Sequence, residues 1–214
     1  MKKFMFLLAA TALLTGGCLT SENHHTFYLD PDGSVVWSVL EQEVRSDEQN
    51  AEDRRREEEA MLEAVRIGRG DVAEALYALG GSRVDSRILR DERPFTILTE
   101  ARFTSIADAL ERFLDDLSPD SRAELATRGS RRYLTFSYRE GSADDSDEGR
   151  PKWAEALLES AERYRFVLTA GRFVEATGFR LEAGDTAAVL LEPDEESIET
   201  NDGCARYELV WEAP

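Results

Sequence analysis

Histidine and cysteine are scarce in this chain, and their scarcity limits the chemistry that it can perform. The sequence contains two cysteines, Cys18 and Cys204, and two adjacent histidines, His24 and His25. Hydrolytic triads, zinc sites and most proton relays use histidine or cysteine side chains. Cys204 opens a strand-like run near the C-terminus, so we interpret it as a half-buried packing residue. We therefore predict no catalytic nucleophile and no zinc site.

Carboxylates are the other candidates for chemistry, because the chain holds 44 aspartates and glutamates. Asp115-Asp116 is one adjacent pair, but neighbouring residues on a helix point in different directions, which favours solvated side chains. An extracytoplasmic hydrolase that works through carboxylates is the alternative function that the sequence leaves open. No glycine-rich stretch has the spacing of a phosphate or dinucleotide loop, so we expect no cofactor.

One acidic segment matches part of a calcium-binding loop. Oxygen-bearing side chains and a glycine fall at positions 1, 3, 5, 6 and 12 of that pattern: Asp144, Ser146, Glu148, Gly149 and Glu155. The segment departs from the pattern because a strand is expected before it in place of a helix, and because glutamate stands at the fifth position. It is a calcium candidate, and the sequence assigns no metal site.

The N-terminus has the pattern of an export signal. Lys2 and Lys3 form a positive start, and the apolar run from Phe4 to Leu14 is too short to span a bilayer as a helix. Small residues then precede a cysteine in Leu13-Leu14-Thr15-Gly16-Gly17-Cys18. This segment resembles the lipobox of bacterial lipoprotein precursors. The resemblance implies a signal peptide over residues 1–17 and lipid attachment at Cys18.

Lipid attachment at Cys18 would anchor the protein to a membrane. A cysteine thiol can accept a diacylglycerol as a thioether, and the amine freed by cleavage can accept a third acyl chain such as palmitate. Each buried methylene contributes about 0.8 kcal/mol, so two or three chains hold firmly. Leu19 follows the cysteine, which in Gram-negative lipoproteins favours the outer membrane. We predict a lipid-anchored protein of the cell membrane or outer membrane, with its domain on the extracytoplasmic side.

Composition indicates an acidic globular domain behind this anchor. The formal charge of the chain is −18, and removing residues 1–17, which carry two lysines and no acid, changes it to −20. Nucleic acid is repelled by so acidic a surface, so we predict no nucleic-acid partner. We expect residues 18–25 to be the lipidated N-terminus and a polar tether, with His24 and His25 in solvent. Residues 26–214 are expected to form a single domain.

Helices and strands are both predicted in this domain. The turn Asp30-Pro31-Asp32-Gly33 joins two apolar runs and predicts a hairpin over residues 26–41. Helices are predicted at residues 47–69, 71–79, 105–117 and 151–163. The stretch at 47–69 is dense in charge, which favours a solvated face and leaves a contact surface for a partner as the alternative. The helix after Ser105 has an apolar face at helical spacing, formed by Ile106, Leu110, Phe113, Leu114 and Leu117.

The predicted strands give the fold class. Extended runs occur at residues 84–89, 95–103, 131–139, 164–169, 172–182, 186–192 and 205–213. The last four have the spacing of an antiparallel meander. The order of elements segregates helices from hairpins. We therefore predict an α+β fold with antiparallel sheets, hairpins and a C-terminal meander, packed by three to four helices.

The layout of the chain is similar to that of mycobacterial LppM-type lipoproteins. The features that carry this similarity are the Asp30–Gly33 hairpin near the anchor, the strand that leads into Phe103-Thr104-Ser105, and the final strand Tyr207–Glu212. The resemblance implies a membrane-tethered envelope protein with a cavity that accommodates lipid. We therefore expect a non-catalytic module that binds lipid or an envelope protein. A deep apolar pocket would favour lipid, whereas two facing carboxylates would favour the hydrolase.

Replacing Cys18 tests the anchor. We expect acyl mass on Cys18 of the native protein, and a Cys18→Ser variant should lack that mass and leave the membrane fraction. Intact-protein mass spectrometry and membrane fractionation check both points. An unacylated, soluble native chain would contradict the lipoprotein prediction.

Overall fold

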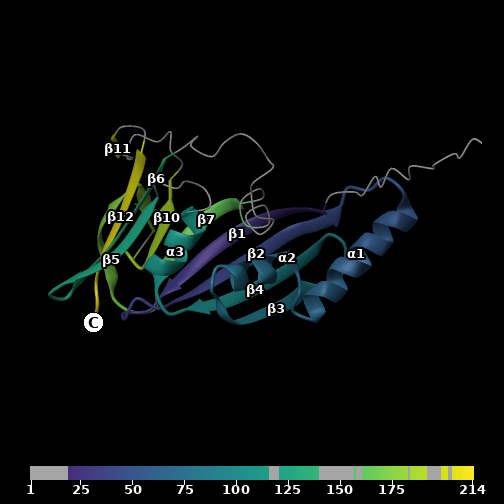
Figure 1. The fold of residues 1–214 in the computed structure, drawn as a ribbon, viewed down its shortest axis with the longest axis horizontal. Helices are drawn as coiled ribbons and strands as arrows, with labels where there is room; N and C mark the ends of the chain where they lie inside the picture. The colour runs from purple at the N-terminus through teal and green to yellow at the C-terminus, as the bar shows by residue number, and fades with distance from the viewer. Residues whose placement is uncertain are drawn as a thin grey trace, which may run out of the picture.

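The computed structural model describes residues 19–115, 121–139, 157, 161–182, 184–191, 199–201 and 204–214. Strands dominate these residues and form a seven-stranded sheet and a five-stranded sheet. Three helices occur within the described ranges (Figure 1). The α+β fold packed by three to four helices that the sequence predicts is therefore wrong, because the described chain is mostly β.

The larger sheet contains the N-terminal half of the domain and part of the C-terminal half. Its strands are β1 Leu19–Leu29, β2 Val35–Ser46, β3 Ser82–Arg90, β4 Phe95–Phe103, β7 Ala161–Leu168, β9 Phe179–Leu181 and β10 Ala187–Leu190. They lie in the order β3-β4-β2-β1-β7-β10-β9, so β1 is central. Neighbouring strands are antiparallel except β1 and β7, which run parallel.

The smaller sheet is antiparallel throughout. Its strands are β5 Arg122–Arg128, β6 Arg131–Arg139, β8 Arg172–Thr177, β11 Glu199–Asn201 and β12 Cys204–Glu212. The order is β11-β12-β6-β5, and β8 also pairs with β12. β11 and β8 therefore share one edge of β12, which they pair with at different positions along its length.

The predicted C-terminal meander is wrong. The chain crosses between the two sheets in this region, because β7, β9 and β10 belong to the larger sheet whereas β8, β11 and β12 belong to the smaller one. Residues 161–163, which we predicted to end a helix, begin β7. Spacing and turn residues mark where strands start and stop, but they do not say which strand is the partner. Partner choice here depends on contacts distant in sequence.

The N-terminal hairpin is confirmed. Asp30 N donates to the Ser34 carbonyl at 2.9 Å, and Gly33 N donates to the Asp30 carbonyl at 3.0 Å. Gly33 has φ +91°, which glycine adopts at low cost. A side chain at this position would also meet Leu125 of β5. The turn therefore fixes the register of β1 against β2 and lies against the smaller sheet.

The expected tether is part of this hairpin. Residues 19–25 form the first half of β1, which pairs with β2 from Leu19 onwards and with β7 from Asn23 onwards. Asn23 and His25 are buried on the inner face of the sheet. Our expectation that His25 is solvated is therefore wrong. The polar residues suggested an exposed tether. In the structure, β1 lies between β2 and β7, which hydrogen-bond to its backbone on both sides. This central position in the sheet, and not the polarity of the side chains, determines which residues are buried.

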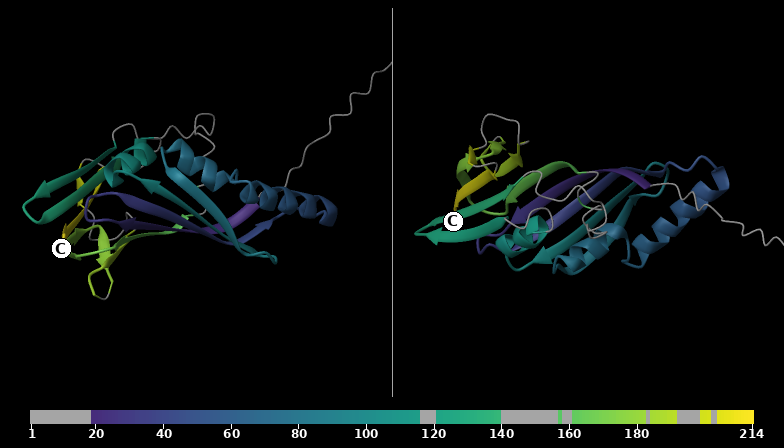
Figure 2. Two further views of the ribbon diagram at one scale, coloured as in Figure 1. Left: turned by 90° about the horizontal axis from the view of Figure 1, so that it is seen from below. Right: turned by 45° about the horizontal axis from the view of Figure 1, so that its top comes forward.

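The helices cover one face of the larger sheet (Figure 2). Their bounds are α1 Ala51–Arg66, α2 Asp71–Ala78 and α3 Ile106–Asp115. Asn50 caps the N-terminus of α1: its side chain accepts hydrogen bonds from the backbone N–H groups of Glu52 and Asp53. The predicted apolar face of α3 is confirmed by the burial of Ile106 and Phe113, among others, while Leu117 lies outside the described residues.

Glu58 attaches α1 to the end of the larger sheet. This nearly buried carboxylate accepts from Arg93 Nε at 2.8 Å and from the backbone N–H of Ser46 at 3.2 Å. Arg93 also donates to the Ser46 carbonyl at 3.2 Å. Beside this group, Leu62 and Val65 pack on Phe95 and its neighbours. A buried carboxylate is tolerated here because it has both an ion-pair partner and a backbone donor.

Aromatic residues dominate the main core. Trp37 on β2 is fully buried, and its ring lies 4.7 Å from Phe27, 5.9 Å from Phe103 and 5.3 Å from Phe113 between centroids. These contacts join β1, β2 and β4 to α3. Trp37 is thus the residue at which the larger sheet and α3 meet.

Truncation of this ring should be costly. We expect Trp37→Ala to lower the free energy of unfolding by roughly 3–5 kcal/mol, because it removes a fully buried ring and leaves a cavity. Leu89→Ala on β3 serves as the control, since Leu89 is 56% exposed and should change stability by less than about 0.5 kcal/mol. Urea unfolding of both variants measures the difference. Equal stabilities would contradict the role given to Trp37.

Candidate ligand-binding cavity

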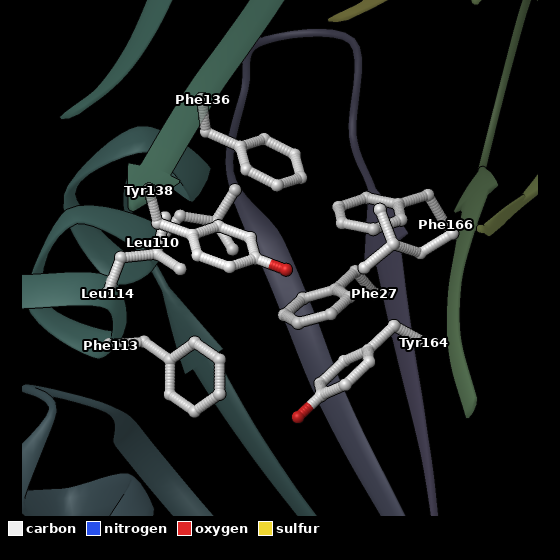
Figure 3. Close-up of a pocket in the computed structure, with 9 residues that line it drawn as sticks. Phe27, Leu110, Phe113, Leu114, Phe136, Tyr138, Tyr164 and Phe166 are labelled. Carbon is white, nitrogen blue, oxygen red and sulfur yellow. The ribbon is translucent and has the colours of Figure 1, made fainter. Parts of the chain in front are cut away.

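An apolar cavity lies where the two sheets and α3 meet (Figure 3). Its volume is about 150 Å³. Nine residues line it: Phe27, Leu110, Phe113, Leu114, Phe136, Tyr138, Tyr164, Phe166 and Leu190. They come from β1, α3, β6, β7 and β10, so both sheets and the helix contribute. None of these nine residues, which belong to the described part of the chain, is charged.

Simple periodicities place these side chains. Phe136 and Tyr138 are two apart on β6, and Tyr164 and Phe166 are two apart on β7, so each pair shares one face of its strand. On α3, Phe113 and Leu114 are three and four positions after Leu110, so all three lie on one face of the helix. The parallel pairing of β1 with β7 sets Phe27 opposite Phe166. The cavity therefore needs pairings between segments about 140 residues apart.

Stacked rings connect the two sheets beside the cavity. The rings of Phe27 and Phe166 are stacked at 4.7 Å, and Phe166 lies 6.4 Å from Phe136 of the smaller sheet. Phe136 in turn stacks on Tyr207 at 4.9 Å. Aromatic pairs at such distances stabilise by about 0.5–1.5 kcal/mol beyond the area they bury. We call Phe27, Phe166, Phe136 and Tyr207 the aromatic bridge.

Two tyrosine hydroxyls are the polar side-chain atoms of the cavity lining. The Tyr138 hydroxyl lies 3.3 Å from the Tyr207 hydroxyl. The Tyr164 hydroxyl donates to the carbonyl of Leu157 at 3.4 Å. Burial raises the pKa of Tyr164, and nearby Tyr138 raises it further. The lining is therefore neutral.

A buried histidine lies behind Tyr164. The His25 ring stacks on Tyr164 at 4.7 Å, and its Nδ1 accepts a hydrogen bond from Trp37 Nε1 at 3.1 Å. That bond leaves the hydrogen on Nε2. Burial lowers the pKa of His25 to about 3, with a smaller contribution from His24, while the Leu157 carbonyl raises it. His25 is therefore neutral at physiological pH.

A second titratable group lies on the same face of the sheet. Glu41 on β2 pairs in register with Asn23 of β1. Burial raises the pKa of Glu41 to about 8, and Asp71 at the start of α2 adds to the rise. Glu41 does not line the cavity. At neutral pH this carboxyl is mostly protonated.

The residues singled out from sequence do not converge on the cavity. Cys18 and the calcium candidate, Asp144, Ser146, Glu148 and Glu155, lie outside the described residues. Cys204 is half-buried at the start of β12, as predicted. Asp115 is exposed at the end of α3. Within the described ranges, no group of three or more potential metal ligands is found.

The chain is similar to a solved structure but matches no protein family. No protein-family model matches the chain, and no curated protein matches it. Among solved structures, the chain is similar to the folded domain of LppM from Mycobacterium tuberculosis, determined by NMR. The identity is 12%, 94% of each chain is covered, and the TM-score is 0.43. A similarity at this level carries no argument about residue roles or function.

Each helix within the described residues is too short or too polar to span a bilayer.

The sequence did not reveal the position of the cavity or its lining. The apolar face of α3 and the alternation of Phe136 and Tyr138 were both visible in the sequence. The parallel neighbour of β1 was not, because the chain between β1 and β7 gives no local signal of their pairing. Without that pairing, the aromatic residues of β7 could not be placed opposite α3.

His25 should make stability depend on pH. Its pKa is 6.5 when unfolded and about 3 when folded, so between these values the unfolded chain binds a proton that the folded chain does not. The contribution of His25 to stability is thus present above pH 6.5 and is lost as the pH falls towards 3, by at most about 1.4 kcal/mol per pH unit. A His25→Gln variant should lack this slope. Denaturant unfolding of both proteins across pH 3–8 measures it, and parallel profiles would contradict the assignment.

Glu41 should change stability with pH in the direction opposite to His25. Its pKa rises from 4.5 to about 8 on folding, so the folded chain holds a proton that the unfolded chain has lost. Stability should therefore fall as the pH rises from 4.5 to 8, and Glu41→Gln should remove this fall. The same unfolding series, with the Gln variant as the reference, checks the prediction. A Gln variant that is less stable than the native protein at pH 8 would contradict it.

Proposed function

We propose that this chain is a non-catalytic, membrane-anchored envelope lipoprotein whose domain binds an apolar, lipid-like ligand in the cavity between the sheets. The observation that carries this proposal is a cavity lined by six aromatic and three leucine side chains without a charge. Ligand sites are typically concave and apolar with few polar groups. The cavity meets that description.

The energetics of such a cavity favour an apolar occupant. Each Å² of apolar surface moved out of water contributes about 25 cal/mol. Water in the cavity would find two tyrosine hydroxyls, whereas a buried water usually makes about three hydrogen bonds. An apolar group therefore fills this space at lower free energy than water does.

The proposed anchor and the cavity lie at different places along β1. Leu19, the residue after Cys18, begins the strand, and Phe27 lines the cavity eight residues later. At about 3.3 Å per residue, this separation is about 26 Å along the strand. An anchored domain would therefore hold its ligand at a distance from the point of attachment.

The carboxylate hydrolase finds no support at this site. Among the described residues, no carboxylate lines the cavity, and Glu41 is mostly protonated at neutral pH. His25, which could act as a base in principle, has its pKa lowered to about 3 and lies behind the ring of Tyr164. The cavity has the chemistry for binding rather than for proton transfer.

A larger side chain at Leu110 should block the cavity. We expect wild-type protein to bind a lipid with one fluorescent acyl chain saturably, and Leu110→Trp to weaken this binding at least about tenfold by filling the cavity. Fluorescence titration measures the affinity, and circular dichroism shows whether the variant is folded.

The matched control is the same substitution on the surface. Leu89→Trp adds the same side chain at an exposed position of β3, and it should leave the affinity unchanged. Equal affinity of a folded Leu110→Trp variant and the control would overturn the proposed site.

A further inference from the structure

The two hydroxyls of the cavity are weakly satisfied. Their oxygen–oxygen distances, 3.3 Å for Tyr138 with Tyr207 and 3.4 Å for Tyr164 with Leu157, exceed the 2.5–3.0 Å usual for O–H···O hydrogen bonds. Both residues line an otherwise apolar wall (Figure 3). A ligand oxygen that reaches either hydroxyl would therefore gain a hydrogen bond that the protein itself makes poorly.

The surroundings of these hydroxyls disfavour charge on a ligand. Burial raises the pKa of Tyr164, so this residue offers no negative partner to a cation. The nearest histidine, His25, has its pKa lowered to about 3 and offers no positive partner to an anion. An ion that enters such a site loses its hydration without gaining a counter-charge. The group that enters the cavity is therefore uncharged.

The volume limits the size of that group. Apolar cavities of about 150 Å³ accommodate one benzene ring, and this cavity has about that volume. A single ring or the last five or six carbons of one alkyl chain fits, and two chains do not. Any charged or larger part of the ligand lies outside the cavity.

We propose that the cavity selects an uncharged ring or chain end that carries a hydroxyl or carbonyl oxygen, and that the hydroxyl of Tyr138 or of Tyr164 recognises this oxygen. This inference rests on the proposed function and specifies its ligand. A polar site discriminates strongly because a ligand without the oxygen leaves the protein groups poorly bonded. The two tyrosines are thus specificity-determining residues.

Phenol and toluene test the inference, because they have the same size and differ in one hydroxyl. Calorimetry and ligand-detected NMR measure binding of both, and of benzoate as the charged analogue. The wild-type protein should prefer phenol over toluene by about three- to tenfold, the size expected for one net hydrogen bond. Benzoate at pH 7 should bind at least about tenfold more weakly than phenol.

Tyrosine variants locate the preference. Tyr138→Phe and Tyr164→Phe should each reduce the preference for phenol, and the double variant should abolish it while toluene still binds. Tyr133→Phe is the matched control, because Tyr133 is on the same strand as Tyr138 but contacts Arg128 and does not line the cavity. Its preference should equal that of the wild type.

The outcomes separate this inference from the proposed function. Equal binding of phenol and toluene, or an unchanged preference in the double variant, would overturn the oxygen recognition while the binding of the fluorescent lipid stands. Benzoate binding as tight as phenol would overturn the exclusion of charge. Failure of both rings and of the lipid to bind would overturn the proposed function as well.

Discussion

Ring packing between the two sheets is the contact on which the structure depends. Phe166 on β7 touches Phe27 in its own sheet and Phe136 in the other, so it holds the sheets at a spacing that side chains fill only in part. Phe113 of α3 lines the space that remains, and its ring packs edge-on against Trp37 at 5.3 Å between centroids. The cavity is what this arrangement leaves open. The proposed binding and the folding would thus depend on the same side chains.

Elements whose signals lie within a few neighbouring residues, such as the first hairpin and α3, could be predicted from the sequence. The Asp30–Gly33 turn specified its hairpin because its residues set their own backbone angles. The apolar face of α3 was readable because a helix repeats within a few residues. The fold class was wrong because strand pairing is not local: β7 joins β1 in parallel and β8 leaves for the other sheet. His25 shows the same limit, since its side chain is polar and its burial comes from two neighbouring strands.

Ion pairs attach neighbouring elements at two separate places on the larger sheet. Glu58 and Arg93 form a nearly buried pair that holds α1, whereas the exposed pairs along α1, such as Arg56 with Asp53, stabilise little in water. At the other edge, Glu182 accepts from both Arg163 and Arg165, which lowers the pKa of Glu182 and ties the end of β9 to β7. The acidic surface is thus compatible with order, because several of its ordered acids have arginine partners.

The central position of β1 has a mechanical consequence. The strand begins at Leu19 and has hydrogen-bonded neighbours on both sides, β2 antiparallel and β7 parallel. A pull applied at Leu19 along the strand would load these two ladders in shear, so many hydrogen bonds would have to break together before the strand could slide. A domain held by this end would resist extraction by tension better than one held by a terminal loop. β1 would then both contribute Phe27 to the cavity lining and transmit the applied force to the rest of the domain.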